Sequence, residues 1–327
     1  MLEDHISSKK SLFSPGVHTE LREQKSRSRQ VALIQGNLTG NARMESSGTS
    51  ARVYENGVYG FSSIAECSGD AAETVLKAAT ENAGFMDRHV GRGKEPLPVI
   101  PCSQISRGRD ILDTDQKRYV EFASQLDAYI TEKYPGLSSR SVIVSEDSME
   151  KIICTSDGCS GHICAPRSYI YVFLNSETTS GTPIELFKPL GGAGNFSDNF
   201  TDPALLYPQI DALYEQLMQK REGVYAEAGY KTVVLSGFMS GMLAHEAVGH
   251  TVEADLVLGG SVAGPSLNKC VASELVSLVD FAHTAFGRPA PLPVYLDDEG
   301  TPAEDAVLIK DGILTGYMHN RESAQHF

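Results

Sequence analysis

Long apolar runs are absent from this 327-residue sequence. No stretch approaches the ~20 consecutive apolar residues that a membrane-spanning helix needs. The first thirty residues also lack the apolar core of a secretory signal peptide. We therefore expect no membrane partner and a cytoplasmic location. In that compartment the six cysteines are expected to remain reduced thiols.

Dense runs of lysine and arginine are also missing. The chain has 28 basic and 42 acidic side chains, which gives a formal net charge of −14. Proteins that bind nucleic acid usually present a basic patch, because neutralising phosphates drives their affinity. Nucleic acid is therefore not expected as a partner.

Length and composition predict a globular protein of several domains, since 41% of the residues are hydrophobic and 21% are charged. We expect residues 1–30 to form a polar, flexible tail. Residues 31–225 are expected to form an N-terminal domain, either as one unit or as subdomains 31–95 and 100–225. A C-terminal domain is expected over residues 230–327.

Local patterns predict helices mixed with hairpins, without regular βαβ alternation. Asn56-Gly57 and Asp311-Gly312 are typical hairpin turns. The expected helices cover 71–83, 115–134 and a segment from Pro203, and the expected strands include 141–145, 151–155, 169–175 and 232–236. We predict an α+β fold with antiparallel sheets. An N-terminal α/β-type domain is followed by an incomplete, β-rich C-terminal domain that carries the site helix.

The most informative segment reads HEAVGH at residues 245–250. At about 100° per residue, His245, Glu246, Gly249, His250 and Glu253 fall on one side of a helix that is mostly apolar elsewhere. Neutral imidazoles are good zinc ligands, and a neighbouring carboxylate can accept a proton from a water whose pKa zinc lowers to about 7. The pattern favours a metal site over the alternative, a helix with two buried, hydrogen-bonded histidines.

The spacing of the two histidines differs from the usual HExxH pattern, in which they lie four residues apart on one face. Here they lie five residues apart, about 140° around a regular helix. Both can reach one metal only if the helix widens locally or ends before His250. We therefore predict a π-type turn, which Gly249 would make easier. Glu246 is the expected general base, and Glu253 is either a third ligand or an acceptor that fixes an imidazole tautomer.

Two other clusters have weaker patterns. Cys154, Cys159 and Cys164 are spaced by five residues, with His162 between the last two, which is at the wide limit for a structural zinc site. We interpret them as buried thiols, because the segment is typical of strands and a turn. The acidic cluster 297–299 ends a predicted strand, and we assign it no role.

The sequence resembles the TldD/PmbA family of metallopeptidases. The resemblance rests on HEAVGHTVEAD (245–255), VYENGVYGFSS (53–63), VASELVSLVD (271–280) and YLDDEGTP (295–302), the last followed by AVLIKDGILTGYM. It covers most of the chain from about residue 31 onward. The HExxxH motif places the chain on the TldD side, because PmbA-type subunits lack this motif.

The resemblance implies a Zn²⁺ cofactor, with His245 and His250 as ligands and Glu246 as the catalytic acid/base. It also implies cleavage of flexible peptide substrates and a homodimer or a heterodimer with a PmbA-like subunit. The family's remaining ligand is a cysteine near the end of a longer chain, so we expect the C-terminal domain to be truncated. Cys270 is an alternative third ligand, although a small core residue is the simpler interpretation. The alternative function is a non-catalytic binding or assembly subunit.

Overall fold

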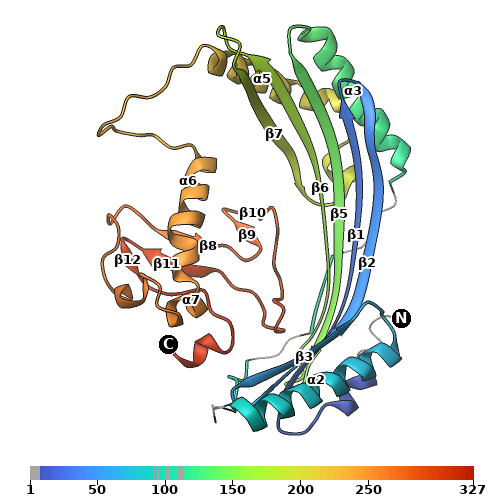
Figure 1. The fold of residues 1–327 in the computed structure, drawn as a ribbon, viewed down its shortest axis with the longest axis vertical. Coiled ribbons are helices and arrows are strands. Elements are labelled where there is room, and N and C mark those ends of the chain that lie inside the picture. Colours follow the sequence, from blue (N-terminus) through green and yellow to red (C-terminus); the bar gives the residue numbers. More distant parts are fainter. Residues whose placement is uncertain (1–7, 92, 94–95, 101–103, 109–113) are drawn as a thin grey trace.

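The computed structural model describes residues 8–91, 93, 96–100, 104–108 and 114–327. Its main feature is a long, curved sheet in the order β3-β2-β1-β5-β6-β4, with β7 also paired to β6 (Figure 1). Every pair is antiparallel except β4 with β6. The strands are β1 (His18–Ile34), β2 (Asn37–Glu55), β3 (Val58–Ile64), β4 (Gln104–Arg107), β5 (Ser139–Thr155), β6 (Ser160–Glu177) and β7 (Pro183–Ala193). Antiparallel strands with separate helices confirm the predicted α+β class.

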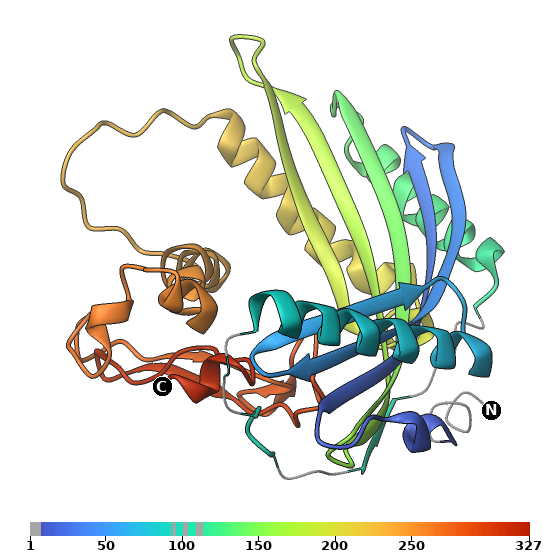
Figure 2. The same cartoon turned by 60° about the horizontal axis from the view of Figure 1, so that its bottom comes forward.

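Three helices cover one face of this sheet. Helices α3 (Gln116–Lys133) and α5 (Tyr207–Arg221) pack near one end, on a cluster that includes Val142 and Val172. Helix α2 (Gly69–Val90) crosses the strands at the other end and packs on Leu21 and Ile152 (Figure 2). Val142 and Ile152 are an even number of residues apart on β5, so both clusters lie on the same face.

A polar band separates the two apolar clusters on this face. Between Val144 and Ile152, the residues of β5 that share their face are Glu146, Ser148 and Glu150. Glu146 is fully buried and accepts hydrogen bonds from the Tyr119 hydroxyl and the Phe196 amide. Small helical elements, α4 (Phe196–Asn199) and a 3₁₀ turn (Pro203–Leu206), lie between β7 and α5.

The N-terminal tail expected over residues 1–30 is wrong from His18 onward. Residues 18–30 belong to β1, which pairs with β2 on one side and β5 on the other. This strand is polar because its middle crosses the polar band, so no apolar alternation marks it. The subdomains suggested for 31–95 and 100–225 therefore share one sheet. Residues 1–7 of the expected tail lie outside the described residues.

Several local predictions are confirmed. The hairpin of β2 and β3 turns at Asn56-Gly57, where both residues have positive φ angles, 49° and 87°. Helix α3 begins after Asp115, whose side chain accepts from the Lys117 amide. Other local predictions differ from the structure. Helix α2 is longer than the expected 71–83, because it begins after Ser68 and continues to Val90. The strand expected over 232–236 is wrong, because those residues have no regular structure.

The C-terminal part begins with α6 (Gly237–Leu243) and contains short elements around a small core. These include α7 (Ala254–Leu258), β9 (Thr284–Ala285), β10 (Arg288–Pro289) and a three-stranded sheet of β8 (Leu278–Asp280), β11 (Ala306–Lys310) and β12 (Ile313–Leu314). The hairpin of β11 and β12 turns at Asp311-Gly312, as predicted. Val252, Ala254, Leu308 and Leu314 are buried in its core. No helix of the described residues is long and apolar enough to span a membrane.

The C-terminal part contacts the sheet on the face opposite the helices. Leu296 packs on Ile153 and Ile163, and a Cβ at Gly161 would lie 2.2 Å from the Leu296 side chain. The Lys151 ammonium lies 2.7 Å from an Asp298 carboxylate oxygen. The domain boundaries near 225–230 remain a prediction, although residues 222–236 form an exposed connection without regular structure.

Candidate metal site

The HEAVGH motif lies on a π-helical turn, Ala244–Gly249, between α6 and a 3₁₀ turn, His250–Val252. The backbone N–H of His250 donates to the His245 carbonyl, which is the five-residue hydrogen bond of a π turn. This turn brings residues five apart onto one side, and the two imidazole rings have centroids 4.7 Å apart. The predicted π turn is thus confirmed. It allows two histidines five residues apart to lie on the same side of the helix.

Glu253 lies beside the second histidine. Its Oε1 atom is 2.8 Å from Nδ1 of His250. The backbone around Glu253 is held by Met318, whose N–H donates to the Val252 carbonyl and whose carbonyl accepts from Ala254. A carboxylate on Nδ1 fixes the imidazole orientation and leaves Nε2 as the metal-facing atom. Glu253 therefore fits the tautomer-fixing role better than the role of a direct ligand.

The polar side of the motif is open to solvent. His245, Glu246 and His250 are exposed, whereas Val252 and Ala254, farther along, are buried. The alternative of two buried, hydrogen-bonded histidines is therefore wrong. Two accessible imidazoles, one of them oriented by a carboxylate, match the donor chemistry that zinc prefers.

A third ligand does not converge on these histidines within the described part of the chain. There, three donor side chains come within 4.8 Å of one another only at Glu150, His162 and Cys164, on the sheet. Cys270 is exposed and contacts the Ala272 carbonyl, and no described contact joins it to His245 or His250. The motif thus brings together two imidazoles, the Glu246 carboxylate on the same turn and the Glu253 carboxylate beside His250.

The opposite side of the motif faces an apolar groove of about 640 Å³. Ala244, Ala247 and Val248 form one wall. The other lining residues include Leu235, Val262, Val271, Val276, Leu278, Ile309 and Leu314. Several apolar side chains of this region are widely exposed, among them Val234 at 94% and Leu275 at 90%. Apolar surface is therefore exposed in this part of the chain.

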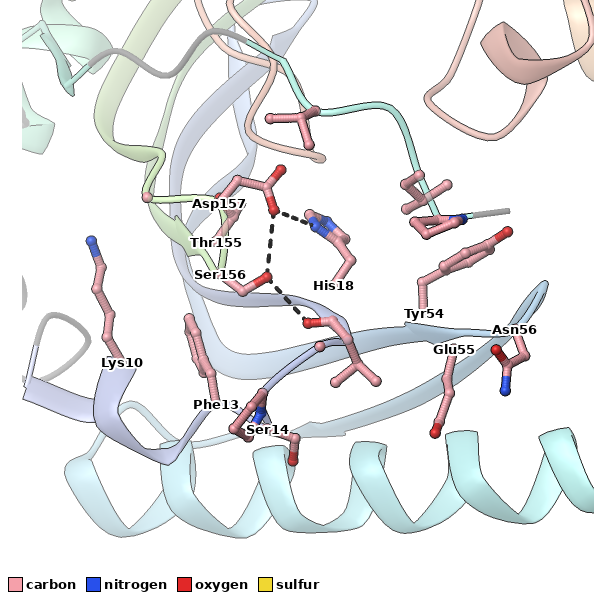
Figure 3. A pocket seen from close by; sticks show the side chains of 17 residues that line it. Lys10, Phe13, Ser14, His18, Tyr54, Glu55, Asn56, Thr155, Ser156 and Asp157 are labelled. Carbon is pink, nitrogen blue, oxygen red and sulfur yellow. Dashed lines mark hydrogen bonds and ion pairs between the residues drawn. The ribbon is translucent and has the colours of Figure 1, made fainter. Parts of the chain in front are cut away.

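Sequence reasoning missed a network of ion pairs that fastens the C-terminal part to the sheet. Arg52 bridges Glu20 and Glu299, with 2.8 Å contacts to each. Arg321 is 4% exposed and its guanidinium lies 2.6 Å from Asp157. The imidazole of His18 points toward Asp157 in a pocket at this end of the sheet (Figure 3). Glu20 and Arg52 are 32 residues apart, and the other pairs are separated by more than a hundred residues, so no local pattern indicates them.

The network changes the acidity of its carboxyl groups. Burial raises the pKa of Glu20, but hydrogen bonds from His18 and Arg52 outweigh burial and hold that pKa below its ordinary value. Burial likewise opposes ionisation of Asp157, and hydrogen bonds from Arg321 and His18 lower its pKa overall. Both groups therefore stabilise the contact in their charged forms.

The cysteines are not all as expected. Cys67, Cys154, Cys164 and Cys270 are thiols, whereas Cys159 is disulfide-bonded, so the expectation of six reduced thiols is wrong at that position. Burial raises the pKa of Cys154 to about 12, which makes it an unreactive core residue.

Comparison with known proteins gives two matching family models. Residues 19–83 match the PmbA/TldA metallopeptidase domain 1, and residues 228–327 match the PmbA/TldA metallopeptidase C-terminal domain. A metalloprotease of Methanothermobacter thermautotrophicus is 27% identical over 94% of this chain and 65% of its own length. A Saccharolobus solfataricus protein named zinc metalloprotease TldD homolog is 33% identical over 33% of this chain and 24% of its own length.

The fold is also similar to that of a solved structure. The crystal structure of TldE from Thermococcus kodakarensis is similar with a TM-score of 0.66 and 15% identity, over 97% of this chain and 69% of that one. The present chain spans about two thirds of the length of the Methanothermobacter relative. The two family models together match about half of the residues, from both ends of the chain. This chain belongs to the TldD/PmbA family of metallopeptidases.

Proposed function

We propose that this chain is a zinc-dependent metallopeptidase subunit of the TldD type that hydrolyses flexible peptides. The observation that carries the proposal is the π turn, which brings His245 and His250 together beside Glu246. The relatives' names, metalloprotease and zinc metalloprotease TldD homolog, support the same chemistry. The open polar side of the motif suits an extended, flexible peptide, because such a chain can approach an exposed site.

Each residue of the site has its own role in this proposal. His245 and His250 would hold Zn²⁺, with Glu253 keeping the His250 ring oriented through Nδ1. When bound, zinc supplies a Lewis acid that lowers the pKa of water and polarises a peptide carbonyl. Glu246 accepts a proton from the attacking water on its carboxylate and delivers it to the leaving amine. Glu246 is exposed on the same turn, so its carboxylate can reach a bound peptide.

A substitution of the proton acceptor tests this function. The full chain and its Glu246→Gln variant are assayed with a fluorescence-quenched, unstructured peptide, after zinc removal by a chelator and again after zinc addition. We expect activity only with zinc, and a roughly 10²–10⁴-fold lower turnover in Glu246→Gln. Glu227→Gln, in the exposed connection, is the matched control and should keep full activity. Unchanged turnover in Glu246→Gln would refute the catalytic role.

We also propose that the chain works as a homodimer or with a PmbA-like partner in the cytoplasm. The exposed apolar groove behind the motif supports an assembled state, because monomers rarely leave large contiguous apolar patches open. Sedimentation of the full chain, alone and with its partner, tests this. Phe238→Asp, at a 73% exposed position, should weaken association if this region is the contact.

A non-catalytic assembly subunit is the second function that an observation favours. Within the described residues, no third donor joins His245 and His250. Under this alternative the full chain binds its partner normally, but zinc-loaded protein hydrolyses no peptide, and Glu246→Gln changes neither property. The assay with zinc and Glu246→Gln separates the two functions.

A further inference from the structure

We propose that Glu150, His162 and Cys164 form a second Zn²⁺ site, on the central sheet and independent of the HEAVGH motif. The three side chains lie on the helix-covered face, in the polar band between the two apolar clusters. The sequence alone indicated a zinc site only weakly at His162 and Cys164, because the third donor, Glu150, comes from another strand. The structure supplies that missing donor.

Strand register creates the cluster. Glu150 of β5 pairs directly with Cys164 of β6, and Ile152 pairs with His162. Directly opposed residues in an antiparallel pair lie on one face with close Cβ atoms. His162 is two residues from Cys164 on the same strand, so its side chain also points to this face. The three donors are thus held by paired backbone rather than by a mobile loop.

The distances suit a metal ion. Nε2 of His162 lies 2.9 Å from Oε1 of Glu150 and 3.8 Å from Sγ of Cys164. In a tetrahedral zinc site, ligand bonds of about 2.0–2.3 Å place ligand atoms roughly 3.3–3.6 Å apart. Zinc entry therefore requires a shift of about half an ångström at the Glu150 carboxylate, and the sulfur is already near its place.

The geometry argues against a catalytic relay made of the same residues. A relay of the cysteine protease kind uses both imidazole nitrogens, one for the thiol and one for the carboxylate. Here the same nitrogen, Nε2 of His162, faces both Glu150 and Cys164. Convergence of a nitrogen, an oxygen and a sulfur on one point is what a shared metal ion needs.

The surroundings allow a metal to enter and be retained. The side chain of His162 is 29% exposed and that of Glu150 is 15% exposed, whereas Cys164 is buried. A thiolate and a carboxylate together carry two negative charges, which Zn²⁺ neutralises. Thiolate and imidazole ligands select zinc over magnesium or calcium. Three protein ligands leave one coordination position open.

Cobalt titration of the full chain tests the site, because Co²⁺ bound to a thiolate gives a charge-transfer absorption that Co²⁺ bound to histidine and carboxylate alone lacks. The chain carries His245→Ala and His250→Ala, which remove the motif's ligands. We expect one Co²⁺ per chain with the thiolate absorption, displaced by Zn²⁺. Cys164→Ser should abolish the absorption, and Cys270→Ser, which removes an exposed thiol, should leave it unchanged.

Two further variants keep the test decisive if Cys164→Ser fails to fold. His162→Gln and Glu150→Gln retain the thiol, and each should weaken Co²⁺ binding at least tenfold while far-ultraviolet circular dichroism stays unchanged. Zinc should raise the Tm of the parent chain, and not that of these variants, since a ligand that binds only the folded state stabilises it. Thiolate absorption that persists in Cys164→Ser, or no Co²⁺ binding by a folded parent chain, would overturn the proposal.

Discussion

The Nδ1 atom of His250 lies 2.8 Å from Oε1 of Glu253, three residues farther along the chain. His250 lies in a 3₁₀ turn and Glu253 is extended, with φ −66° and ψ 123°. A carboxylate on Nδ1 of a metal-binding histidine fixes the orientation and the tautomer of the ring.

Removal of this carboxylate should weaken zinc binding. In Glu253→Ala, Nδ1 of His250 loses its acceptor, and we expect zinc affinity at the motif to fall roughly 10–100-fold. Competition with a chelating dye measures the affinity, in the Cys164→Ser background so that only the motif is observed. Glu227→Ala serves as the control and should bind zinc as the parent does. Equal affinities for Glu253→Ala and the control would show that the contact does not orient a ligand.

Gly249 should tolerate substitution by alanine, although it lies within the HEAVGH motif. Its φ of −48° and ψ of −59° are ordinary right-handed helical values. An added Cβ would meet only the Ala244 carbonyl, at 3.6 Å. Gly249→Ala should therefore keep its zinc affinity, and it should gain up to about 1 kcal/mol of stability from helix propensity. A lower Tm or a loss of zinc would mean that the π turn needs glycine.

Gly60 should tolerate no side chain at all. It lies in β3 under α2, where a Cβ would come within 2.1 Å of the Ala79 carbonyl and 2.3 Å of the Ala83 nitrogen. Gly60→Ala must push the helix off the strand, and we expect a loss of roughly 1–3 kcal/mol in the free energy of unfolding. Urea denaturation measures it. Gly136→Ala, with nothing within 4 Å of the added atom, is the control and should change little.

Acid should weaken the contact between the sheet and the C-terminal part. The pKa values of Glu20 and Asp157 are lowered in the fold from ordinary values of 4.5 and 3.8. Groups with lowered pKa values add stability above their ordinary pKa, and this stability is lost as pH falls through the folded values. Arg321→Met removes a partner of Asp157, so the Tm of this variant at pH 7 should be lower than that of the parent and should fall less steeply below about pH 3.8.

A matched substitution separates this effect from general acid denaturation. Arg288→Met removes one exposed positive charge in β10, away from the network. Its Tm should follow the parent at every pH. If the Tm of Arg321→Met changed with pH in parallel with the Tm of the parent, Arg321 would not stabilise the charged form of Asp157.

Local signals were enough for much of the fold. The Asn56-Gly57 and Asp311-Gly312 turns, the position of α3 and the widened helix at HEAVGH each depend on neighbouring residues, so they could be predicted from the sequence. The strand expected at 232–236 failed for the opposite reason. Apolar, β-branched residues favour a strand only when another strand pairs with them, and within the described residues none does.

Features that depend on strand register could not be predicted from the sequence. Residues 22–30 are almost wholly polar, yet they form the middle of a paired strand because they cross the polar band of the sheet. Glu150 meets His162 and Cys164 only through the pairing of β5 with β6. Arg321 meets Asp157 across 164 residues of sequence. Spacing along the chain carries no information about such neighbours.

The zinc content of the purified chain shows whether the π turn holds a metal ion. The purified full chain carrying Cys164→Ser is loaded with zinc, dialysed and measured by elemental analysis, beside the same chain with His245→Ala or His250→Ala. We predict close to one zinc per chain in the first sample and almost none in the other two, with the fold intact by circular dichroism. Zinc content that is negligible in the first sample, or unchanged when either histidine is removed, would contradict a metal centre on the π turn.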